Sequence, residues 1–308
     1  MEIGFHLPDF RLHFRLNSIL ISAITHYPKY FIDGIKIKSI FGAFPGSLWN
    51  GGRYAGGTTD VKVIGGVVKM FNDAGIPLRF TFTNPLITKE HLGDPFCNKI
   101  LEEADGGFNE VIVMSPILEE YIRENYPRYP ITSSTCKQIE TMDGVKEELA
   151  KDYKYVVLDY NWNNKFDELE KIDPADRERC EILVNACCEP HCPRRGEHYR
   201  QIGSEHIKAW ESQKNPHNPP YKYNDFKCPY MMRSIFNVKK LDTFVSQSDI
   251  IEKYAPMGFS NFKIEGRTAA DVMLLESYVN YMAKPEYRDE ARFMIMVQLT
   301  KSTRYFMS

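Results

Sequence analysis

Eight short apolar segments, spread along almost the whole chain, restrict the fold more than any other feature. They are residues 2–7, 38–44, 77–84, 110–115, 130–134, 154–160, 181–186 and 260–265. Short apolar runs of this kind are typical of strands buried on both faces. Segments with a helical pattern lie between them, as at 60–74, 116–125 and 268–284. Strands that alternate with helices in this way predict an α/β fold, a closed (β/α)8 TIM-like barrel, with a doubly wound open sheet as the alternative.

The stretch 189–242 interrupts this alternation. It contains no convincing strand, it includes the proline-rich connector 215–223, and its lysines and arginines outnumber its acidic residues. Long excursions at the carboxyl ends of barrel strands usually carry function. We therefore expect one barrel domain over residues 1–308, with 189–242 inserted as a rim or lid segment.

Composition and charge exclude several classes of protein. The chain is 43% hydrophobic and 26% charged, as expected for a globular protein, and its net charge of −2 gives no overall nucleic-acid footprint. No apolar stretch approaches the roughly 20 residues of a transmembrane helix. The first residues lack the pattern of a signal peptide. The sequence thus predicts a soluble, cytoplasmic protein without a membrane partner.

The cysteines give the strongest functional signal. The chain has seven, and an odd number in a large cytoplasmic protein argues against a disulfide framework. Cys187, Cys188 and Cys192 follow the seventh predicted strand, and Cys228 lies further along the excursion. Four thiolates suit an iron–sulfur cluster, whereas a structural zinc site would accept three or four of them, with His191 available. Buried thiols without a metal are the remaining alternative.

Two further groups of residues are candidates because they follow predicted strands. In 262–267 the alternation places Lys263, Glu265 and Arg267 on one side of the backbone, either to bind an anionic substrate or to form a buried charge network. Ser134 follows the fifth predicted strand, where it either contacts a ligand or caps a helix. Asp159 is a candidate by its position alone. The glycine-rich loop 51–57 lacks the spacing of a nucleotide-binding loop.

The Lys263–Arg267 sequence, lysine-isoleucine-glutamate-glycine-arginine, resembles the closing motif of the U32 "peptidase" family. Segments 245–251 and 255–259, together with 74–84, 110–116 and 126–135, resemble the family in the same order, so that the similarity spans roughly residues 35–290. Several members are not peptidases: they hold a four-cysteine [4Fe-4S] cluster and support oxygen-independent hydroxylation of tRNA, rRNA or quinone precursors. This chain departs from the family where Asn185 and Ala186 replace a histidine-glycine pair. The cysteine spacing is also shorter, and Cys136 replaces a glutamine.

The resemblance implies an iron–sulfur enzyme in which Cys187, Cys188, Cys192 and Cys228 hold the cluster. Cys136 and Cys180 remain alternative ligands. The implied reaction is hydroxylation or a related group transfer on a ring, a base or a small anionic molecule, free or RNA-borne, with a redox partner or a partner subunit. A U32-type peptidase is one alternative, although no nucleophilic triad and no His-Glu-x-x-His motif can be recognised. A metal-stabilised binding protein is the other.

Overall fold

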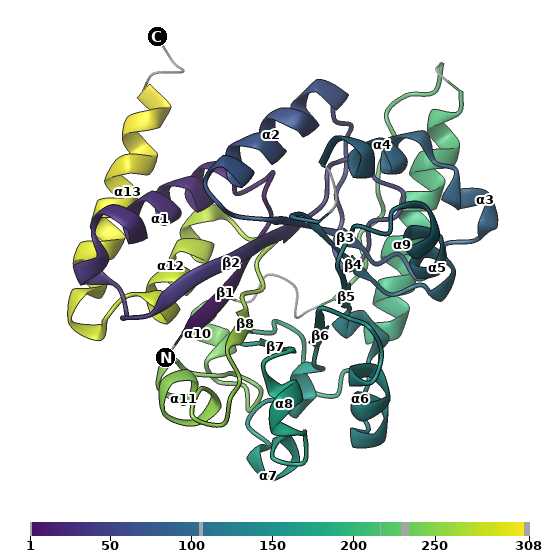
Figure 1. Cartoon of the computed structure of the whole chain (residues 1–308). Coiled ribbons are helices and arrows are strands. Elements are labelled where there is room, and N and C mark those ends of the chain that lie inside the picture. The colour runs from purple at the N-terminus through teal and green to yellow at the C-terminus, as the bar shows by residue number, and fades with distance from the viewer. Residues whose placement is uncertain (1, 105–106, 216, 229–233, 305–308) are drawn as a thin grey trace.

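The eight strands form one closed, parallel barrel in sequence order (Figure 1). The computed structural model describes residues 2–104, 107–215, 217–228 and 234–304. The strands are β1 Ile3–Pro8, β2 Ile35–Gly42, β3 Leu78–Phe82, β4 Glu110–Val113, β5 Ile131–Ser133, β6 Tyr155–Val157, β7 Cys180–Leu183 and β8 Asn261–Lys263. Each predicted segment overlaps one of them, and the predicted barrel is confirmed.

The second strand differs from its prediction. It starts at Ile35, where it pairs with Ile3 of β1, and it ends at Gly42. Ala43 and Phe44 prolonged the apolar pattern because they are buried, although they lie beyond the sheet. Burial at the mouth of the barrel therefore produced the apolar pattern of a strand in two residues that are not part of the sheet.

The helices pack around the barrel. They are α1 Phe14–His26, α2 Val61–Asp73, α3 Lys89–Leu92, α4 Pro95–Ala104, α5 Pro116–Asn125, α6 Met142–Leu149, α7 Phe166–Leu169, α8 Pro174–Arg177, α9 Arg195–Gln213, α10 Ile235–Val238, α11 Gln247–Asp249, α12 Asp271–Met282 and α13 Arg288–Arg304. The prediction for 116–125 is confirmed to the residue, and Asp60 caps α2 by accepting from the Lys62 amide at 2.9 Å. Where we predicted a helix from residue 268, α12 begins at Asp271. Within the described residues, none of the helices combines the length and apolar character needed to cross a lipid bilayer.

Alternation along the strands separates two environments. Outward side chains such as Phe5, Leu78 and Phe80 belong to the hydrophobic core shared with the helices. Inward positions such as His6, Arg79 and Glu181 are polar, and each is 0% exposed. The lumen of the barrel is therefore filled by charged and hydrogen-bonding groups.

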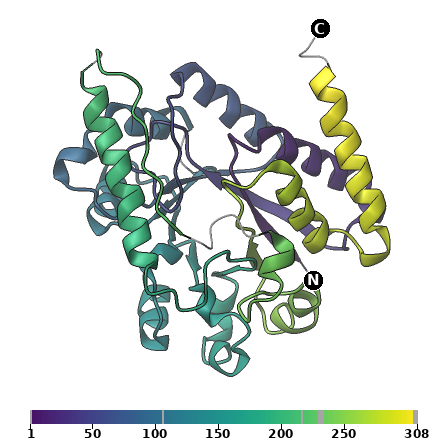
Figure 2. The ribbon, with the colours of Figure 1, turned by 180° about the vertical axis from the view of Figure 1, so that it is seen from behind.

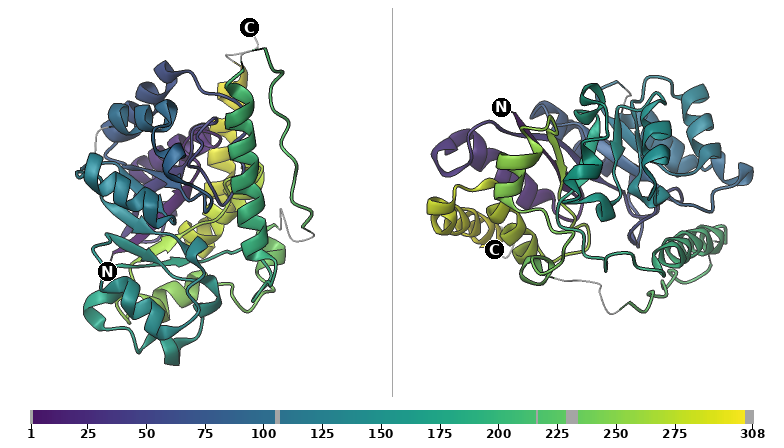
Figure 3. Two further views of the ribbon diagram at one scale, coloured as in Figure 1. Left: turned by 90° about the vertical axis from the view of Figure 1, so that its right-hand side faces the viewer. Right: turned by 90° about the horizontal axis from the view of Figure 1, so that it is seen from below.

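The excursion after β7 consists of a long helix and an extended return. Its described residues form no strand, as predicted, but they include α9, which the sequence analysis did not predict. Figure 2 shows α9 on the side of the barrel opposite α13, and Figure 3 shows the extended return segment (residues 217–228) running beside it. Glu205 of α9 joins the two parts, because its carboxylate accepts from the Tyr221 hydroxyl at 2.9 Å and from the Asn224 amide at 2.8 Å.

Candidate functional site

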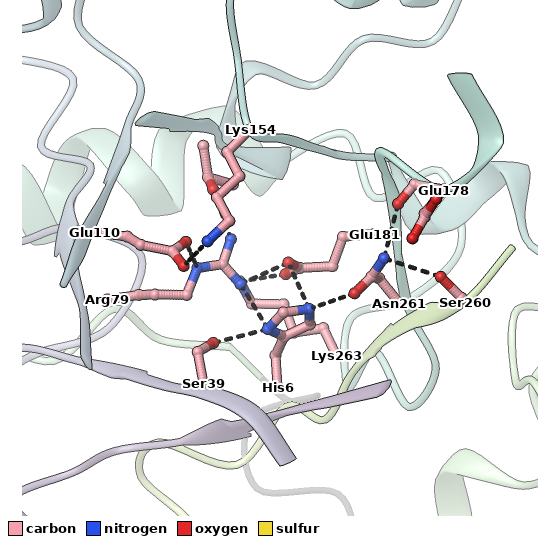
Figure 4. A network of polar contacts seen from close by, with 11 residues as sticks. His6, Ser39, Arg79, Glu110, Lys154, Glu178, Glu181, Ser260, Asn261 and Lys263 are labelled. Atoms are coloured by element: carbon pink, nitrogen blue, oxygen red, sulfur yellow. Dashed lines mark hydrogen bonds and ion pairs between the residues drawn. The ribbon is translucent and has the colours of Figure 1, made fainter. Parts of the chain in front are cut away.

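A buried ion network fills the lumen below the mouth of the barrel (Figure 4). Arg79 donates to Glu181 Oε2 at 2.6 Å and to Thr132 Oγ1 at 2.7 Å, and the Lys263 ammonium lies 3.0 Å from Glu181 Oε1. Burial lowers the pKa of His6 to about 3, so this imidazole is neutral inside the network at neutral pH. Burial also lowers the pKa of Lys263, to about 8. Lys263 thus belongs to a buried charge network, which was one of the two interpretations of the 262–267 segment; the other was binding of an anionic substrate.

The same lysine also lines a small cavity above the network, which we call the inner chamber. Its volume is about 90 Å3. Glu265, Arg267, Ser134 and Cys188 line it too, so five of the predicted site residues meet there. Arg53 adds a further cation, and the other lining residues are apolar, aromatic, small or sulfur-bearing: Phe41, Gly51, Gly52, Thr81, Thr83, Ile112, Thr135, Cys136, Tyr160, Leu183 and Tyr199.

A second, wider cavity opens beside the inner chamber, and we call it the outer cavity. Its volume is about 370 Å3, and Cys187, Cys188 and Cys228 all line it. Arg53, Glu265, Arg267 and Cys188 line both cavities and form the boundary between them. Three of the four predicted cluster cysteines therefore face one space at the mouth of the barrel.

The fourth cysteine, Cys192, lies in the loop before α9 and within electrostatic range of Cys188. Burial raises the pKa of the Cys188 thiol; Arg53 and Arg195 oppose this effect, whereas Cys192 and Cys228 add to it. Among the described residues, no three histidine, cysteine, aspartate or glutamate side chains converge closely enough to hold a single metal ion. Three of the four thiols thus border one cavity and Cys192 lies near Cys188, but the four do not meet at a point.

The other cysteines are placed differently. Cys180 starts β7, at the end of the strand away from the mouth; it is 0% exposed, and burial raises its pKa to about 12. Cys136 lines the inner chamber beneath Cys188. Of the two alternative ligands, Cys136 therefore lies near the candidate site, whereas Cys180 does not.

The glycine-rich loop after β2 forms one wall of the mouth. Arg267 donates to the Gly51 carbonyl at 3.0 Å and to Asn50 Oδ1 at 2.8 Å. Gly52 adopts a φ of +73°, which side chains rarely permit, and a Cβ at Gly51 would clash with the backbone of Thr83. The glycines allow the loop to approach β3 closely and carry Arg53 over the barrel.

Ser134 and Asp159 have clear structural partners. Ser134 Oγ accepts from the Cys136 amide at 3.1 Å, so this residue caps a helical turn as well as lining the inner chamber. Asp159 is buried and forms an ion pair with Arg195 of α9, with 3.2 Å between Nη1 and Oδ1. Its carboxylate therefore faces the base of α9 rather than either cavity.

Three residues at the site were not identified as candidates from the sequence. Arg53 lines both cavities, His198 lines the outer cavity, and Tyr199 lines the inner chamber. The signal for Arg53 was its place directly after two glycines that follow a strand. His198 and Tyr199 lie on α9, whose polar sequence gave little indication of a packed helix.

Comparison with known proteins supports the fold. No protein-family model matches the chain, and no curated protein sequence is significantly similar to it. Among solved structures, the U32 peptidase Mk0906 is similar with a TM-score of 0.50 and 17% sequence identity, over 88% of this chain and 93% of that one. At this identity the likeness is one of fold. The barrel is U32-like.

Proposed function

We propose that this protein is an iron–sulfur enzyme whose [4Fe-4S] cluster is held by Cys187, Cys188, Cys192 and Cys228 at the mouth of the barrel. The observation that carries the proposal is that Cys187 and Cys188, which follow β7, share one cavity with Cys228, which lies beyond α9 in the sequence. Thiolates are the usual protein ligands of such clusters. Barrel enzymes place their chemistry at this face.

The donor set fits a cluster better than a zinc ion. A single tetrahedral metal requires its ligands to converge on one point, and the described residues contain no such convergence. A cluster of four irons is larger, so its thiolates stand further apart around it. Thiols that border a cavity of about 370 Å3 suit the larger group. When bound, the cluster would supply electron transfer or an iron site for a substrate.

The residues of the inner chamber would bind and orient the substrate. Its wall combines apolar and aromatic groups with the cations Arg53, Lys263 and Arg267. This combination suits a ring that carries a negative charge, free or presented by RNA, because the apolar wall accepts the ring and the cations pair with the charge. Oxygen-independent hydroxylation or a related group transfer on such a ring is the reaction we infer.

Peptidase activity is the second candidate, and it rests on the name of the structural neighbour. One serine–histidine–carboxylate chain is present: Ser39 Oγ lies 2.7 Å from His6 Nδ1, and His6 Nε2 lies 3.4 Å from Glu181 Oε2. All three residues are 0% exposed inside the barrel. A peptide bond cannot reach this serine, so the arrangement favours the iron–sulfur enzyme over a serine peptidase.

The test is chemical analysis of protein purified without oxygen. Iron and acid-labile sulfide in equal amounts, together with a broad visible absorbance, support the proposal. Stoichiometric zinc without iron or sulfide contradicts it. Hydrolysis of peptides that survives the Cys192→Ala substitution would favour the peptidase instead.

A further inference from the structure

One carboxylate joins the two loops that border the candidate cluster site. Glu265 follows β8, and its Oε2 accepts a hydrogen bond from the Cys187 backbone amide at 2.9 Å. Its other oxygen forms an ion pair with the Arg53 guanidinium. The loop after β7 and the glycine-rich loop after β2 are therefore held to the end of β8 by a single side chain.

The backbone of Glu265 is fixed as well. Its amide donates to Asn185 Oδ1 at 2.6 Å, and its carbonyl accepts from Asn185 Nδ2 at 3.0 Å. Asn185 belongs to the same loop as Cys187, so three hydrogen bonds join these two strand ends. The position of the Cys187–Cys188 pair is thereby tied to the barrel rather than left to the loop.

Arg53 brings a positive charge to the same place. Its side chain is 21% exposed and that of Glu265 is 15% exposed, so water screens the pair only in part. Arg53 lines both cavities beside Cys188 and lies within electrostatic range of Cys187 and Cys188. The Arg53–Glu265 ion pair therefore lies next to any group that Cys187 and Cys188 bind.

We propose that Glu265 and Arg53 form a latch that positions the Cys187–Cys188 pair and sets the reduction potential of the cluster. This inference rests on the proposed function, because it assigns a role toward the cluster to residues that hold no iron. Groups that contact metal ligands fix the orientation of those ligands and tune the metal. Net charge and hydrogen bonding near a cluster are among the determinants of its potential.

If the latch sets the reduction potential, substitutions of Glu265 and of Arg53 should shift that potential in opposite directions. A purely structural role does not predict this. Reduction adds negative charge to the cluster, so a nearby cation favours the reduced form and a nearby anion opposes it. Glu265→Gln removes the anion but keeps an oxygen that can accept from the Cys187 amide. The reduction potential of the cluster should therefore rise in Glu265→Gln and fall in Arg53→Gln. The double variant should return toward the wild type.

The experiment is a redox titration of the reconstituted full-length protein, followed by electron paramagnetic resonance. Glu119→Gln and Arg123→Gln are matched controls, because these residues of α5 form a similarly buried pair at 3.0 Å, with side chains 16% and 36% exposed, and line neither cavity. Their potentials should remain at the wild-type value. Circular dichroism and iron content, measured on each variant, establish that fold and cluster are retained.

The outcomes separate the two proposals. Opposite shifts in Glu265→Gln and Arg53→Gln support the latch, as does loss of the cluster from a folded Glu265→Gln variant while Glu119→Gln retains it. Equal potentials in all variants, or shifts of the same sign, overturn the latch and leave the iron–sulfur proposal standing. A wild-type protein that takes up neither iron nor sulfide contradicts the proposed function itself, and the redox role of the latch with it.

Discussion

Lys263 and Glu181 form an ion pair of 3.0 Å at the level where the filled lumen of the barrel meets the inner chamber. The lysine thus has a structural partner on one side and a cavity on the other. Glu181 is held in addition by Arg79. The two cations of Glu181 should therefore respond differently to substitution.

Arg79→Met should destabilise the protein strongly and Lys263→Met only weakly. Loss of Arg79 removes the cation shared by two buried carboxylates and leaves Glu181 with Lys263 and Glu110 with the partly exposed Lys154. Breaking a buried pair costs roughly 3–5 kcal/mol. Loss of Lys263 leaves Glu181 paired with Arg79. Urea denaturation of both variants measures the difference. A larger loss in Lys263→Met would show that the lysine is mainly a structural element.

The cluster should depend on the mouth cysteines and not on Cys180. Cys192→Ala should abolish the visible chromophore of the anaerobic protein, because it removes one of four thiolates. Cys180→Ala is the matched control, since this thiol is buried at the opposite end of β7. It should retain the chromophore. Iron content per protein provides the measurement, and equal iron in both variants would remove Cys192 from the ligand set.

Glu205→Gln should weaken the site from a distance. The return segment carries Cys228 and is held to α9 by the Glu205 carboxylate, which is 0% exposed. The amide keeps one oxygen but loses the charge that strengthens these hydrogen bonds. We expect faster release of iron to a chelator than in the wild type. Lys208→Ala is the control, because this lysine is half exposed and its pairing with Glu205 contributes at most about 1 kcal/mol.

Acid should destabilise the protein through the buried imidazole of His6. Its pKa is about 3 in the folded protein against 6.5 for the unperturbed group, because burial disfavours the charged form. Between these values the unfolded chain binds a proton that the folded protein does not bind. The free energy of unfolding should therefore decrease as pH falls from 6.5 toward 3, with a limiting slope of about 1.4 kcal/mol per pH unit for one proton. In His6→Gln the free energy of unfolding, measured by denaturation at several pH values, should depend less on pH over this range. The same pH dependence in both proteins would assign the effect to other groups.

RNA binding by the excursion has to be tested with Arg194 rather than Arg195. Arg195 is buried and pairs with Asp159, whereas Arg194 is exposed and lies over the Phe226 ring. If the substrate is RNA-borne, Arg194→Ala should weaken binding, with a log–log salt slope reduced by about 0.7 per lost single-strand phosphate contact. Filter binding across a salt series measures this. Absence of binding at low salt would leave a small molecule as the substrate.

The strands were predictable because each places apolar side chains against the helices, and short apolar-rich runs of this kind are typical of buried strands. Helix α9 was not, because His198, Glu205 and His206 on its buried face are polar and resemble a solvent-exposed surface. Their burial becomes favourable only through partners such as Asn50, which lies 3.0 Å from His206. Asp159 was a candidate only by its position after a predicted strand. Its partner Arg195 lies on the helix that the pattern did not indicate.

The anchoring of the return segment has a consequence for how the protein matures. Three of the proposed ligands follow β7 directly, whereas Cys228 lies on the return segment, which Glu205 joins to α9 through Tyr221 and Asn224. Closing a loop of this length is slow compared with forming local contacts. We therefore expect Cys228 to be the last of the four proposed ligands to take its place, so that the proposed cluster would be completed late in folding.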